Sequence, residues 1–193
     1  MRVLGIIPSR YNSTRFPGKA LADILGKSMI QRVYEQALNC TELEDIIVAT
    51  DDERIFSHVK GFGGKTMMTS KNHKSGTDRC AEISSKLTKE YDVIVNIQGD
   101  EPFINKKQIS KLIKLFSNNK TQIATLAKKI TEFNDYINEN KVKVFFNDDN
   151  VATTFERKSI LNQKEFIENS IYKHIGIYAY RKSILEEITK EKI

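Results

Sequence analysis

The 193-residue chain has no long hydrophobic run, only two cysteines and no tryptophan. No apolar stretch approaches the roughly 18 residues that a membrane-spanning helix needs, so we expect no membrane span. The apolar run after Arg2 ends at Pro8 and is too short for a signal peptide, which makes a cytoplasmic location the default expectation. Cys40 and Cys80 lack the spacing of a metal site, and we expect both to be buried thiols.

The charge pattern also excludes some classes of partner. The formal net charge is +6, but the lysines are interspersed with acids, as in RKSILEEITKEK. Because no basic stripe alternates with aromatic residues, we do not expect a nucleic-acid-binding surface. The length and the 39% hydrophobic content indicate one globular domain whose charge is compatible with small anionic ligands.

Short apolar segments alternate with amphipathic ones along most of the chain. The expected strands are 3–7, 46–49, 65–68, 93–97 and 123–129, and the expected helices are 29–38, 77–87, 105–116 and one capped by Asp51 or Asp52. This alternation predicts an α/β fold with a mainly parallel sheet. From Lys141 onward, VKVFF, VATTF and IYKHIGIYAY read as strands without full helices between them, which predicts an antiparallel edge or flap.

The segment GIIPSRYNSTRFPGK carries the strongest functional signal. Arg10, Arg15 and Lys19 follow the first expected strand in a loop shaped by proline and glycine. Ligands of open α/β sheets bind beyond the carboxyl ends of the strands, and arginine and lysine suit phosphate oxygens. The loop is therefore interpreted as a polyphosphate site, with a solvated basic loop as the alternative.

Three further segments hold candidate site residues. In VIVNIQGDEPFI, Asp100 could ligate a magnesium ion that bridges phosphates, and Gln98 could bind a base or a sugar hydroxyl. The alternative is an ordinary turn, because Gly-Asp and Glu-Pro are common turn dipeptides. In NHKSGTDR, Ser75 or Thr77 could cap a helix and Arg79 could reach a nucleobase. In YKHIGIYAYR, strand alternation places His174, Gly176 and Tyr178 on one face, either as a polar pocket wall or as a half-exposed edge.

Together these segments resemble the 3-deoxy-manno-octulosonate (Kdo) cytidylyltransferases, also called CMP-Kdo synthetases. The resemblance rests on IPSRYNSTRFPGKAL, GKSMIQRVYEQA, IIVATDD, HKSGTDR, VNIQGDEP and HIGIYAYR, and STRFPGK favours this branch over the sialic-acid branch. It implies a Rossmann-like nucleotide-diphospho-sugar transferase fold with one cytidylyltransferase domain over residues 1–193. It also implies that CTP and Kdo form CMP-Kdo and pyrophosphate with Mg²⁺, for lipopolysaccharide biosynthesis.

The resemblance also implies roles for individual residues. By match to the family's motifs, the triphosphate would be held by Arg10, Ser13, Arg15 and Lys19, the cytidine by Arg79 and Gln98, magnesium by Asp100, and the sugar acid by Arg157, His174 and Tyr178. Of these, Arg10, Lys19 and Asp100 would be catalytic.

The chain departs from the family at two places. The family continues past the Lys- and Glu-rich helix that ends at Ile193, into a segment with a second metal-binding aspartate and dimer contacts. FERKSI, around Arg157, also differs from the family's usual pattern. From these departures we expect a weakened homodimer and poor turnover. The alternatives are a cytidylyltransferase for another acidic sugar and an inactive nucleotide-binding remnant.

Overall fold

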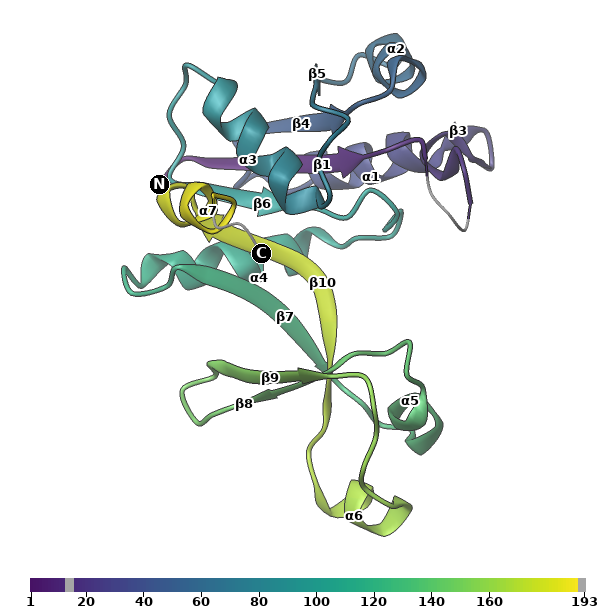
Figure 1. The fold of residues 1–193 in the computed structure, drawn as a ribbon, viewed down its shortest axis with the longest axis vertical. Helices are drawn as coiled ribbons and strands as arrows, with labels where there is room; N and C mark the ends of the chain where they lie inside the picture. The colour runs from purple at the N-terminus through teal and green to yellow at the C-terminus, as the bar shows by residue number, and fades with distance from the viewer. Residues whose placement is uncertain (13–15, 191–193) are drawn as a thin grey trace. The chain divides into compact units, whose positions relative to one another are not determined.

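The computed structural model describes residues 1–12 and 16–190 of the chain, in two compact units (Figure 1). The first unit comprises Met1–Ala124 together with the chain from Ile177, and the second comprises Thr125–Gly176. The second unit begins earlier than the flap that the sequence predicted from Lys141, because residues just after Thr125 already belong to its own small core. That core contains Ile130, Tyr136, Phe166 and Ile171.

The elements follow the predicted alternation of strands and helices. The first unit contains the strands β1 (Val3–Ser9), β2 (Asp23–Ile24), β3 (Lys27–Ser28), β4 (Asp45–Thr50), β5 (Thr66–Met68) and β6 (Val93–Asn96), the helices α1 (Met29–Leu38), α2 (Glu53–Gly61), α3 (Gly76–Lys86), α4 (Lys106–Lys114) and α7 (Lys182–Ile188), and the 3-10 helices η1 (Lys19–Leu21) and η2 (Leu115–Ser117). The second unit contains α5 (Phe133–Ile137), β8 (Lys143–Phe146), β9 (Ala152–Glu156) and α6 (Gln163–Glu168), and the strands β7 (Ile123–Lys129) and β10 (Tyr172–Arg181) each contribute residues to both units.

The sheet of the first unit is mainly parallel, as the sequence predicted. Its strand order is β5-β4-β1-β6-β10, with β5, β4, β1 and β6 parallel and β10 antiparallel to β6. In the register of the central strands, Ile6 of β1 lies opposite Ile47 of β4 and Asn96 of β6. Because these strands are parallel and in register, the loops that follow them emerge at one edge of the sheet.

Helices cover both faces of this sheet (Figure 1). On one face, α3 and α7 pack over a core that includes Leu4, Ile6, Ile83, Ile94 and Leu185. On the other face, α1 and α4 contact β1, β4 and β6. The apolar stripe of α1, with Ile30, Val33, Tyr34 and Ala37 buried, is the helical spacing that the sequence showed. The layered α/β class is therefore confirmed.

Helix starts are set by capping residues, of which the sequence singled out Ser75 and Asp52. Ser75 caps α3 in a reciprocal capping box with Asp78, and Asn105 caps α4 in the same way with Gln108. Of the two candidates for α2, the cap is Asp52, whose carboxylate accepts from the Arg54 N–H. Both cysteines are buried free thiols, as expected.

The second unit is built around the antiparallel pair β8 and β9, and β10 pairs with β8 through Tyr172 and Val144. The three predicted strand segments after Lys141 are thus confirmed, with only the short helix α6 between β9 and β10. Lys143 of β8 is fully buried, and its Nζ donates to the carbonyl oxygen of Arg157.

Among the described residues, no helix combines the length and the apolar character that crossing a bilayer requires.

Candidate active site

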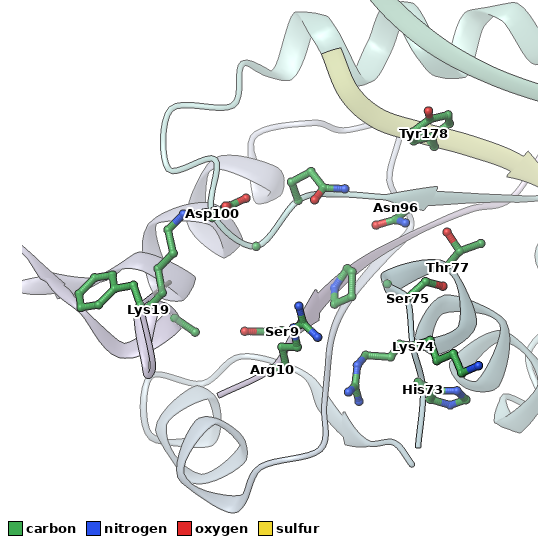
Figure 2. Close-up of a pocket in the computed structure, with 17 residues that line it drawn as sticks. Ser9, Arg10, Lys19, His73, Lys74, Ser75, Thr77, Asn96, Asp100 and Tyr178 are labelled. Carbon is green, nitrogen blue, oxygen red and sulfur yellow. Dashed lines mark hydrogen bonds and ion pairs between the residues drawn. The ribbon is translucent and has the colours of Figure 1, made fainter. Parts of the chain in front are cut away.

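A cavity of about 750 Å³ opens at the carboxyl ends of β1 and β6 in the first unit (Figure 2). Its lining comes from four segments that are far apart in the sequence. These segments are the end of β1 with the loop to η1, the loop before α3, the segment from β6 to Asp100, and Tyr178 of β10. The cavity therefore sits where the parallel-sheet rule predicts a ligand.

Two glycines shape the first and third of these segments at the cavity. A Cβ atom on Gly99 would lie 2.9 Å from the carbonyl oxygen of Pro8, so only glycine lets the segment after β6 pass this closely over the end of β1. Gly18 has a φ of +73° and donates its N–H to the carbonyl of Tyr11 at 2.9 Å. It thereby starts η1 and places Lys19 at the cavity.

Lys19 and Asp100 meet directly at this point. The Nζ of Lys19 lies 2.7 Å from the Oδ2 of Asp100, although 81 residues separate the two in sequence. Both side chains are partly exposed, at 39% and 50%, so the pair adds little to stability. It holds one cation and one carboxylate at the cavity, where both are accessible to a charged ligand.

The start of α3 forms the opposite wall. Ser75, Gly76 and Thr77 line the cavity, and the first backbone N–H groups of a helix carry partial positive charge. A Cβ atom on Gly76 would lie 3.0 Å from the Cγ of Pro8, so glycine lets the helix begin against the end of β1. With Arg10 and Lys19, this wall makes the cavity electropositive.

Arg79 lines the cavity and is only 4% exposed. Its guanidinium forms an ion pair with Asp51 at 2.6 Å and donates to the Thr69 hydroxyl at 2.7 Å and to the Ser70 carbonyl at 3.1 Å. The side chain thus ties α3 to the segments that follow β4 and β5. Because the charge of Arg79 is buried and paired, it holds the shape of this wall.

Comparison with known proteins identifies the class of enzyme. The cytidylyltransferase family matches residues 4–193. The chain is 51% identical to the 3-deoxy-manno-octulosonate cytidylyltransferase of Parabacteroides distasonis, over 98% of this chain and 79% of the relative, and 50% identical to that of Bacteroides thetaiotaomicron, over 98% and 78%. This chain belongs to the 3-deoxy-manno-octulosonate cytidylyltransferase family. The fold agrees with that of a solved CMP:2-keto-3-deoxy-manno-octonic acid synthetase complexed with CTP, with a TM-score of 0.93 and 38% identity over 100% of this chain and 79% of that one.

Most residues that the resemblance assigned to the nucleotide lie at one cavity. Arg10, Lys19, Arg79 and Gln98 line it. Asp100, which was assigned to magnesium, and Tyr178, which was assigned to the sugar acid, line the same cavity. Ser13 and Arg15 lie outside the described residues, so their contacts with a triphosphate stay predictions. Arg79 differs from its predicted use in one respect, since donors of its guanidinium already bind Asp51, Thr69 and Ser70.

The other two predicted sugar ligands, Arg157 and His174, belong to the second unit. Arg157 follows β9 and donates to the carbonyl of Glu139 at 3.4 Å. His174 of β10 lies 2.9 Å from the Thr125 hydroxyl and edge-on to Phe155, and burial lowers the pKa of its imidazole. The roles of both residues toward a sugar acid stay predictions.

Sequence reasoning missed Asn96 as a site residue. It ends β6, is 3% exposed and lines the cavity beside Tyr178, its partner in the register with β10. The available signal was a polar residue inside the apolar run VIVNI, at the position where a strand meets the predicted site. Ser9 and Lys74 also line the cavity and were not singled out.

Glu82 of α3 holds the loop before this helix through hydrogen bonds and ion pairs. The carboxylate accepts from the Ser70 N–H at 2.9 Å and contacts His73 and Lys86. Partial burial raises the pKa of Glu82, but the hydrogen bonds from Lys86, Ser70 and His73 outweigh burial and lower its pKa to about 2. His73 lines the cavity, so this carboxylate supports one of its walls.

We therefore expect Glu82 to contribute an acid-sensitive part of the stability. A lowered carboxyl pKa stabilises the fold above the unfolded value near 4.5, and that contribution is lost as the pH falls toward 2. At pH 7 Glu82→Gln should lower the free energy of unfolding by about 3 kcal/mol, and the difference from wild type should vanish near pH 2. Urea unfolding of both proteins between pH 7 and pH 2 measures this difference in the free energy of unfolding.

A matched control is Glu90→Gln, which removes an exposed carboxylate paired with Lys182 at 2.6 Å. Its effect should stay below about 1 kcal/mol at neutral pH. A difference between Glu82→Gln and wild type that stayed constant across the whole pH range would contradict the assignment.

Proposed function

We propose that this chain forms CMP-Kdo and pyrophosphate from CTP and 3-deoxy-D-manno-octulosonate, a step of lipopolysaccharide biosynthesis. The observation that carries the proposal is one cavity at which Arg10, Lys19, Asp100 and the start of α3 converge, in a member of this family. In the reaction, the anomeric hydroxyl oxygen bonds to the α-phosphorus of CTP. The bond from that phosphorus to the oxygen bridging to the β-phosphorus breaks, pyrophosphate leaves with the electron pair, and the hydroxyl proton passes to solvent.

Such a transfer needs positioning and charge neutralisation more than a covalent nucleophile. Arg10 and Lys19 supply cationic donors for the phosphate oxygens, and the first N–H groups of α3 add partial positive charge. Gln98 offers an amide to the nucleoside. These groups stabilise the negative charge that pyrophosphate carries as it leaves.

Magnesium is part of the proposal, and Asp100 is the residue that would hold it. Magnesium sites commonly use one or two carboxylates together with substrate phosphates and water. The described residues contain no cluster of three or more His, Cys, Asp or Glu side chains suited to a metal, so Asp100 would share the ion with the triphosphate. When bound, the ion supplies positive charge to phosphate oxygens. The half-exposed carboxylate at the cavity fits this use.

The test is turnover of the purified chain with CTP, Kdo and magnesium. Pyrophosphate release and the mass of CMP-Kdo should rise together, and UTP or ATP in place of CTP should give much less product. Product with sialic acid but not with Kdo would favour a cytidylyltransferase for another acidic sugar. Binding of CTP without product from any acidic sugar would favour a non-catalytic nucleotide-binding protein.

A further inference from the structure

Asn96 presents an unused acceptor at the cavity. Among the described residues, two buried side-chain atoms have no hydrogen-bond partner, namely the Oγ of Ser84 and the Oδ1 of Asn96. Only Asn96 of these two lines the cavity. Buried polar groups nearly always have partners, so an orphaned oxygen at a ligand cavity indicates a partner that arrives with the ligand.

Packing alone does not explain an asparagine at this position. The other residues of β6, Val93, Ile94 and Val95, are apolar and fully buried, and an apolar side chain would continue that core. Gly76 packs beside the amide, because a Cβ atom there would lie 3.8 Å from the Nδ2 of Asn96, an ordinary van der Waals distance. The polar side chain therefore lies against the start of α3, which also lines the cavity.

The group that pairs with the Oδ1 of Asn96 must be a hydrogen-bond donor. A carbonyl oxygen accepts hydrogen bonds, while phosphates and carboxylates offer no donor at neutral pH. Figure 2 shows Asn96 beside Thr77 and Tyr178, at the opposite end of the cavity from Lys19 and Asp100. The partner is therefore an amino or hydroxyl group, away from the triphosphate end.

We propose that Asn96 is a specificity-determining residue whose Oδ1 accepts a hydrogen bond from an amino or hydroxyl group of a bound substrate. This inference rests on the proposed function for the identity of the substrates. Donors of this kind are the amino group of cytosine, the ribose 2′-hydroxyl and the hydroxyls of the sugar acid. Loss of the acceptor would leave the donor unpaired beside a buried side chain, which is the situation in which hydrogen bonds discriminate between substrates.

The experiment compares wild type with Asn96→Leu, which keeps a similar volume and removes the acceptor. Calorimetry with CTP, UTP and 2′-deoxy-CTP separates the base amino group from the ribose hydroxyl, and the KM for Kdo, read beside that for CTP, reports the sugar acid. We expect a tenfold to hundredfold loss of affinity for the substrate that carries the donor. The preference for that substrate over its analogue should fall by the same factor.

Two further variants serve as controls for the loss of the acceptor. Asn96→Asp keeps an acceptor oxygen and should retain the preference that Asn96→Leu loses. Ser84→Ala removes the other unpartnered buried group and should leave all affinities unchanged. If Asn96→Leu does not fold, Asn96→Ala is compared in the same way.

Thermal unfolding separates recognition from structure. Because Asn96→Leu removes an unpaired buried oxygen, the unliganded variant should melt at the wild-type temperature or above it, while its stabilisation by the bound substrate should shrink. Unchanged affinities and preferences would overturn the proposal. A lower melting temperature with equal losses for every ligand would overturn it too. Wild-type turnover with CTP and Kdo tests the proposed function separately, and the nucleotide affinities can be measured whether or not turnover occurs.

Discussion

Asp100→Asn should lower kcat on the order of 10²–10³-fold and remove the magnesium dependence of CTP binding. The substitution keeps the shape of the side chain and removes the charge that a magnesium ion requires. Asp100 also pairs with Lys19 at 2.7 Å, so the variant leaves that lysine without its carboxylate. Without magnesium, the variant should therefore bind CTP at least as tightly as wild type.

Calorimetry of CTP binding, with and without magnesium, checks this result alongside steady-state pyrophosphate release. Wild type should bind CTP more tightly when magnesium is added, and Asp100→Asn should not. Glu90→Gln is the control, since it removes an exposed carboxylate that does not line the cavity. A variant at Asp100 that retained the wild-type response to magnesium would exclude this carboxylate as the ligand.

The layered fold was predictable because its signals are local. The apolar residues Val93–Val95 of β6, the helical spacing of α1, and the caps Ser75 and Asn105 each act within a few residues, and each element formed where expected. Boundaries shifted by one or two residues, as with α3, which begins at Gly76 rather than Thr77. The capping box of Ser75 with Asp78 fixes that start.

The site was only partly predictable because its contacts are long-range. The pairing of Arg79 with Asp51 joins residues 28 apart, and nothing near Arg79 in the sequence indicates that its charge is buried. The full burial of Lys143 was hidden in the same way, since in VKVFF it reads as an ordinary polar position of a strand. Both depend on which segments the fold brings together.

Lys19 carries the second large prediction, because it connects the basic loop to the segment after β6. With magnesium and CTP present, the charge of Asp100 would be shared with the ion, and the ammonium of Lys19 would turn to the phosphate oxygens. Lys19→Met keeps the length of the side chain and removes the charge. We expect kcat/KM to fall on the order of 10²-fold, most of it in kcat if Lys19 acts on the leaving pyrophosphate.

The same variant should leave stability almost unchanged, which separates a functional role from a structural one. The Lys19–Asp100 pair is exposed, so its loss should change the free energy of unfolding by less than about 1 kcal/mol. Lys27→Met is the matched control, since Lys27 forms an equally exposed pair with Glu35 at 2.7 Å and does not line the cavity. It should match Lys19→Met in stability and wild type in kinetics.

The double variant Lys19→Met, Asp100→Asn should lose less activity than the two single losses multiplied together, because both residues act on the same triphosphate. Wild-type kinetics in folded Lys19→Met would show that the basic loop binds its ligand without this residue.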